Sequence, residues 1–163
     1  MIDLKKLTVK KAHQTEQGEI VSPPDLNGWY LRCMSGDDTQ IIDVEQWLVD
    51  LSGANPFTML MLGNVSNDAT AVLKSYSIKV DIAESKTVFS SHGMSGWLML
   101  VDDVPAVVVK NPTSFHARDL IVNFNGEIIE LATGKSALAF ANWKIVMGKN
   151  GDPIVSRKSD KSV

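Results

Sequence analysis

The 163-residue chain is predicted to be mainly β, of the α+β class, with antiparallel hairpins that form either a sandwich or a barrel. Three observations predict this class. Asn125-Gly126 stands between two apolar runs, short apolar segments alternate with turn residues over most of the chain, and polar and apolar residues alternate from Lys74 to Ile82. One amphipathic helix and an extended N-terminal arm complete the predicted fold.

The chain is predicted to have three parts: an N-terminal arm (1–25), a single β-rich domain (26–158) and a flexible tail (159–163). The arm ends at Pro23-Pro24, which favours extended backbone and stops any helix before it. Since the chain is long enough for one well-packed domain and short for two, residues 26–158 are expected to share one core.

The helix is predicted at residues 44–52. Asp43 is a suitable N-cap and Gly53 a suitable residue to end the helix. A start at Thr39, with Asp38 as the cap, is an alternative. The apolar residues of this stretch fall on one helical face: Val44, Trp47, Leu48 and Leu51.

The hairpin around Asn125-Gly126 is predicted to have a two-residue turn, because Asn-Gly suits a turn in which both central residues need a positive φ. That turn would place Val122 opposite Ile129. Ile121 and Ile128 would then lie on the other face, where they would mark a partner-binding surface if no other element covers them. Further strands are predicted at 28–34, 39–42, 57–62, 74–82, 87–90, 97–101, 106–109, 139–147 and 154–156.

One tight turn and one sheet edge are also predicted. Asp102-Asp103-Val104-Pro105 joins two apolar runs and suits a tight turn. Pro153 has no backbone N–H for a ladder, so the last strand is expected at an edge of a sheet.

Catalytic chemistry has one candidate in the sequence, the motif Gly93-Met94-Ser95-Gly96. A serine in a G-x-S-x-G elbow is a nucleophile at the start of a helix, but here Trp97 takes the fifth position and a strand is predicted to follow. The main interpretation is a glycine-rich hairpin loop. The alternative is a small serine hydrolase centred on Ser95, with His92 or His116 as the base.

No metal site or cofactor is predicted, since the histidines have no metal-binding spacing and Cys33 is the only cysteine. A single cysteine also excludes an internal disulfide, which suggests a reducing cytoplasm. No apolar run reaches the length of a membrane span, and the first residues lack a signal-peptide pattern.

Charge is distributed unevenly along the chain. Residues 1–11 and residues 144–163 each carry a net charge of +3, whereas residues 12–143 carry −9. The ends are interpreted as solvated segments or as electrostatic arms that dock on an acidic surface. The residues of these arms are Lys5, Lys6, Lys10, Lys11, Arg157 and Lys158.

These observations together predict a non-catalytic protein that acts by binding or assembly, such as a bacterial or phage accessory protein, and that forms a homo-oligomer. Nucleic acid is an unexpected partner, because the body is acidic and lacks an arginine-rich cluster. A third interpretation is a β-barrel that binds a small molecule near Trp29 or Trp97.

Overall fold

Antiparallel strands dominate the protein. The computed structural model describes residues 7–34, 46–111 and 119–158. The strands of this part are β1 (Leu7–Lys11), β2 (Ile20–Ser22), β3 (Tyr30–Met34), β4 (Gln46–Asp50), β5 (Met59–Met61), β6 (Ala69–Leu73), β7 (Tyr76–Asp81), β8 (Lys86–Val88), β9 (Leu98–Val101), β10 (Val104–Val109), β11 (Leu120–Asn123), β12 (Ile128–Ile129), β13 (Ala137–Phe140), β14 (Asn142–Met147) and β15 (Pro153–Arg157). Two 3₁₀ turns, η2 (Ala12–Gln14) and η3 (Leu62–Asn64), are the helical elements of the described residues.

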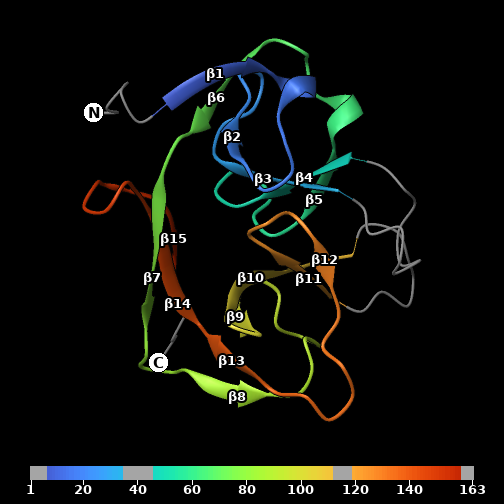
Figure 1. The fold of residues 1–163 in the computed structure, drawn as a ribbon, viewed down its shortest axis with the longest axis vertical. Coiled ribbons are helices and arrows are strands. Elements are labelled where there is room, and N and C mark those ends of the chain that lie inside the picture. Colours follow the sequence, from blue (N-terminus) through green and yellow to red (C-terminus); the bar gives the residue numbers. More distant parts are fainter. Residues whose placement is uncertain (1–6, 35–45, 112–118, 159–163) are drawn as a thin grey trace.

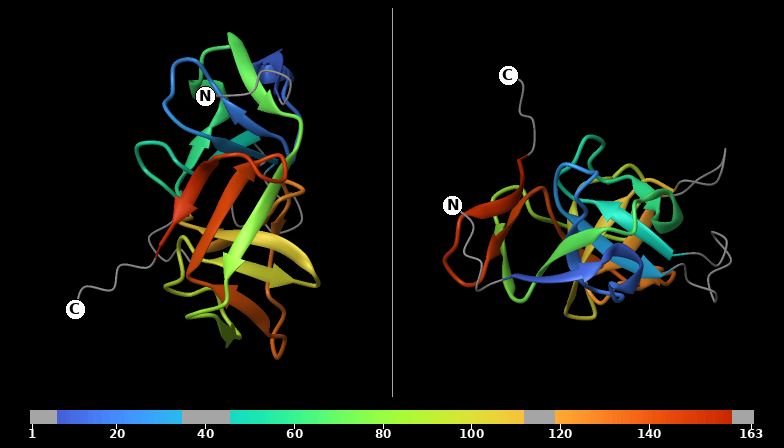
Figure 2. Two further views of the ribbon diagram at one scale, coloured as in Figure 1. Left: turned by 90° about the vertical axis from the view of Figure 1, so that its left-hand side faces the viewer. Right: turned by 90° about the horizontal axis from the view of Figure 1, so that it is seen from above.

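The strands form three sheets (Figure 1). The first sheet has the order β1-β6-β2-β3-β4-β5, the second β12-β11-β10-β9-β13-β8, and the third β15-β14-β7. The segment of β6 and β7 runs along the side of the molecule, leaving the first sheet and entering the third. Seen from above, β7, β14 and β15 lie at one side of the other two sheets (Figure 2).

One large hydrophobic cluster joins the three sheets. Leu31 comes from the first sheet, Val107 and Val122 from the second, and Ile145 and Val155 from the third, and each of these side chains is almost completely buried. The mainly β, antiparallel class predicted from the sequence is therefore confirmed, and the arrangement is sandwich-like.

The predicted register of the Asn125-Gly126 hairpin is wrong by one residue. Ile121 pairs with Ile129, and the backbone N–H of Asn123 donates to the carbonyl of Glu127 at 2.9 Å. The loop therefore has three residues, and only Gly126 of the Asn-Gly pair has a positive φ, of +83°. This is the geometry of a turn followed by a glycine bulge.

The shift exchanges the faces of β12, because a slip of one residue turns every side chain over. Ile128 packs in the large cluster with Val122, whereas Ile129 packs with Ile121 in the cluster on the opposite face of the second sheet. The backbone N–H of Phe124 donates to the carbonyl of Pro105 at 3.0 Å, which ties the loop to β10.

The two-residue turn with both φ values positive occurs elsewhere, between β9 and β10. Asp102 and Asp103 have φ values of 50° and 65°, and Val101 pairs with Val104. The predicted tight turn is confirmed at Asp102 and Asp103, whereas Val104 and Pro105, which the prediction includes in the turn, belong to β10. Aspartate accepts this conformation better than most residues because its short polar side chain can bond locally.

The predicted helix at 44–52 is wrong, since residues 46–50 form strand β4 between β3 and β5. Trp47, Val49 and Leu51 pack in the large cluster, whereas Leu48 packs in a third cluster on the opposite face. A strand that is covered on both faces has consecutive apolar residues. In a short run of this kind, some of the apolar residues also have the spacing of one face of a helix. Residues 39–43, with the alternative helix start, lie outside the described residues.

Strand β14 begins later than the predicted strand 139–147, and the predicted strands do not include β2 and β6. The stretch 139–147 is divided between β13 and β14. The strands β2 and β6 fall in segments whose sequence shows little alternation, whereas Leu7 and Val9 of β1 fit either a short helix or an edge strand. The prediction from Pro153 is confirmed, because β15 is an edge strand of the third sheet.

The segment predicted as an arm contributes two strands to the first sheet. β1 pairs with β6, and β2 lies between β6 and β3. Ile20 and Val21 are buried, so this part of residues 1–25 is integrated in the body. Residues 14–19 are polar, and strand β2 after them has only three residues. The sequence therefore shows no clear strand pattern in this segment.

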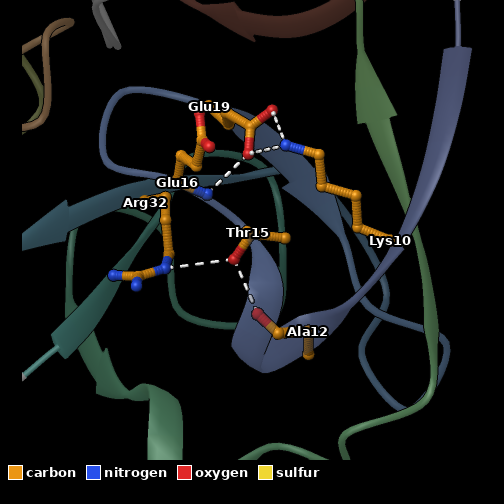
Figure 3. A network of polar contacts seen from close by, with 6 residues as sticks. All are labelled: Lys10, Ala12, Thr15, Glu16, Glu19 and Arg32. Atoms are coloured by element: carbon orange, nitrogen blue, oxygen red, sulfur yellow. Dashed lines mark hydrogen bonds and ion pairs between the residues drawn. The ribbon is translucent and has the colours of Figure 1, made fainter.

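A polar network anchors the segment between β1 and β2 to the first sheet (Figure 3). Arg32 is buried, and its Nε donates to the hydroxyl of Thr15 at 3.1 Å. That hydroxyl donates in turn to the carbonyl of Ala12 at 2.6 Å. Above it, Lys10 forms an ion pair with Glu19 at 3.1 Å. Burial lowers the pKa of Arg32, although the nearby Cys33 and Glu19 act in the opposite direction.

The tip of the Asn125-Gly126 hairpin lies directly against this segment. A Cβ atom on Gly126 would lie 2.5 Å from the backbone nitrogen of Gly18 and 2.6 Å from the carbonyl oxygen of Arg32. Both distances are far shorter than any normal contact, so only glycine fits here.

We predict that Gly126→Ala lowers the free energy of unfolding by about 3 kcal/mol, the upper end of the usual range for a point substitution. Both the positive φ and the backbone contacts oppose the new methyl group. Gly134→Ala is the matched control, because Gly134 has a φ of +84° with no atom within 4 Å of its Cβ position. The control variant should lose only the free energy that a left-handed backbone conformation costs a residue other than glycine, about 1–2 kcal/mol. The measurement is urea unfolding of both variants. An equal decrease in the free energy of unfolding would contradict the close contact at Gly126.

Candidate functional site

The predicted catalytic residues do not form a triad among the described residues. Ser95 is half-buried in a turn that leads into strand β9, without the helix of a nucleophile elbow. His92 is exposed, and no hydrogen bond joins its side chain to Ser95 within the described part of the chain. His116 lies outside the described residues. The loop has the form of a turn closed by the N–H of Trp97, which donates to the carbonyl of Met94 at 2.9 Å.

We predict that a fluorophosphonate probe does not label the protein, because no described base contacts the hydroxyl of Ser95. The measurement is in-gel fluorescence of the wild type beside Ser95→Ala. Labelling that disappears in the variant would support the hydrolase interpretation.

The predicted binding residues are mostly buried. Ile121 is 2% exposed and Ile128 is 6% exposed, so neither side chain is accessible to a partner. Trp29 belongs to the large hydrophobic cluster. Trp97 is half-buried, with Lys86 Nζ 5.0 Å and Arg157 Cζ 5.7 Å from its ring centroid. Trp97 therefore makes two cation–π contacts.

The basic arms have different surroundings. Lys5 and Lys6 lie outside the described residues, Lys10 is paired with Glu19, and Lys11 is exposed. At the other end, the structure brings Arg157 and Lys158 together with Lys144 from the neighbouring strand β14 and with Lys79 from β7, which is distant in the sequence.

This cluster lines a groove of about 390 Å³ at one end of the third sheet. Three strands contribute to it: the end of β7, the start of β14 and the end of β15. Four of its residues are basic and one is acidic, which gives the groove a local charge of +3. The lining residues are Lys79, Val80, Asp81, Ile82, Asn142, Trp143, Lys144, Ser156, Arg157 and Lys158.

Two of the lysines directly face each other across the sheet. Lys79 on β7 pairs with Lys144 on β14, and Lys144 pairs with Ser156 on β15. Both lysines are exposed, and neither forms an ion pair with a described carboxylate. Like charges at directly opposed positions destabilise a sheet. An anion bound between them would remove this repulsion.

Arg157 is held in a fixed position beside the groove. One Nη atom donates to the carbonyl of Ala141, the guanidinium lies over Trp97, and the residue pairs with Trp143 in the β14–β15 ladder. Burial lowers the pKa of Arg157, and no described carboxylate lies within ion-pair distance of it. A partly desolvated cation without a counterion is favourable for binding an anion.

Apolar surface adjoins the basic groove. Val80 is 42% exposed and Ile82 76% exposed, at the end of β7. Within the described residues β7 pairs only with β14, so its other edge carries free backbone groups. The end of this sheet thus combines positive charge, apolar side chains and an open strand edge.

The sequence contained part of this site. Lys144, Arg157 and Lys158 all lie in the basic segment 144–163, and Lys79 is one of the polar residues of the alternating stretch 74–82. The register of β14 between β7 and β15, which brings Lys144 opposite Lys79, has no signal in the sequence.

No three His, Cys, Asp or Glu side chains of the described part of the chain lie close enough to hold a metal ion. Within residues 7–34, 46–111 and 119–158, no helix is long and apolar enough to cross a membrane.

Cys33 is buried in the core, and burial raises the pKa of its thiol to about 12. Since the thiolate is the reactive form, we predict that Ellman's reagent at about pH 8 leaves the folded protein unmodified and modifies one thiol in denaturant. The thiol ionises at lower pH in the unfolded chain, so its contribution to stability is lost as the pH rises from 9.0 toward about 12. Rapid modification of the folded protein would contradict its burial.

Comparison with known proteins gives no assignment: no protein family, no curated protein and no solved structure matches the chain.

Proposed function

We propose that the protein is a non-catalytic binding protein that acts through protein–protein contacts. The observation that supports this most strongly is the exposed end of the third sheet, where the open edge of β7 adjoins the basic groove. Open strand edges are templates for pairing with another chain, and soluble proteins usually protect them. Here Val80 and Ile82 are exposed at that edge.

The surface suits an extended partner. A strand added to β7 would use its free backbone groups for affinity, and the side chains of the groove for specificity. The proposal includes a homo-oligomer as well as a complex with a different protein.

The test is photo-crosslinking in cells that naturally produce the chain. We predict that a benzophenone amino acid at position 82 gives a discrete adduct, because Ile82 is 76% exposed beside the groove. The matched control carries the same group at position 9, since Val9 is 69% exposed on β1. The mass of the adduct separates a second copy of the chain from a different protein. No adduct at position 82, or equal adducts at both positions, would contradict the proposal.

A further inference from the structure

We infer that the groove at the end of the third sheet binds an acidic, extended segment of a different protein. This inference rests on the proposed function and names the chemistry of the partner. It starts from charge: the groove carries +3 in a chain whose net charge is −3.

Among the described residues, no carboxylate forms an ion pair with the basic side chains of the groove. Lys79 and Lys144 oppose each other directly, and Arg157 is half-buried without a carboxylate partner among the described residues. Carboxylates of a bound segment would separate the two ammonium groups, which lie on one face of the sheet, whereas Arg157, which pairs with Trp143, lies on the other face.

The form of the site favours a short acidic strand over a long polyanion. Asp81 lies in the lining, and the middle of the chain, residues 12–143, carries −9. A nucleic acid that extended past the groove would meet this negative surface, and Trp143, the one aromatic residue of the lining, is only 3% exposed and cannot stack with bases. Exposed Val80 and Ile82 suit the apolar side chains of an extended peptide.

A second copy of the chain fits the groove less well than a different protein. Acidic residues of this chain stand in succession only at 37–38 and 102–103. The pair Asp102-Asp103 forms the tight turn between β9 and β10. Within the described residues, no two acidic residues are separated by a single residue, so this part of a second copy offers no strand with carboxylates at alternate positions.

The experiment uses the full chain and a fluorescein-labelled peptide of four Glu-Ser repeats, with anisotropy as the readout. We predict that the wild type binds this peptide, that binding weakens as salt is added, and that a peptide of four Gln-Ser repeats does not bind. Lys144→Glu should weaken binding at least about tenfold, since it reverses a central charge of the groove. Lys135→Glu should leave binding unchanged, because exposed Lys135 pairs with Asp102 outside the groove.

The stability of the variant shows that its loss of binding is not caused by unfolding. Lys144→Glu places opposite charges at a directly opposed pair, so its melting temperature should equal or exceed that of the wild type. Failure of the wild type to bind the acidic peptide, or equal binding by Lys144→Glu, would overturn the inference.

Two further measurements test for other occupants of the groove. Tighter binding of a dT octanucleotide than of the peptide would assign the groove to nucleic acid and overturn the inference. Light scattering that shows self-association of the wild type but not of Lys144→Glu would assign it to a second copy, with the same consequence. An adduct at position 82 without peptide binding would reject the acidic partner and leave the proposed function intact.

Discussion

The contact between the Asn125-Gly126 hairpin and the segment around Gly18 fixes the first sheet against the second. The glycine at position 126 approaches the backbone of Gly18 and Arg32 so closely that no side chain can be added. The same glycine forms the bulge that sets the register of β11 and β12. One residue therefore determines which side chains of the hairpin enter the large cluster and where the hairpin lies on the first sheet.

The Arg32 network gives this contact a rigid support. Arg32 accepts a backbone hydrogen bond from Gly18 at 2.8 Å and donates one to Glu19 at 2.9 Å, while its side chain holds Thr15. A buried guanidinium is stable only when its donors are satisfied, so the segment between β1 and β2 has one preferred path over the sheet. The tip of the hairpin meets a surface that is already ordered.

The third sheet differs from the other two because part of it projects beyond the core. Ile145 and Val155 are buried in the large cluster, whereas the end of β7 is exposed. The buried part anchors the strands and thereby places Lys79, Lys144 and Arg157 at fixed positions around the groove. A rigid scaffold with an uncompensated charge is suited to binding, since little ordering is required when a partner arrives.

The sequence alone determined the mainly β class, the turn at Asp102-Asp103 and the edge position of β15, because alternation, turn residues and the missing N–H of Pro153 act locally. Tertiary structure decided that residues 46–50 form a strand, since pairing with β3 and β5 stabilises a run that equally fits a helical stripe. It also decided the register at Gly126, which depends on contact with a segment more than 100 residues earlier in the chain. The tertiary structure also decided the groove. Lys79 and Lys144 are 65 positions apart in the sequence and become neighbours only through the register of β7 with β14. Such pairings depend on long-range packing, which a local pattern of residues does not encode.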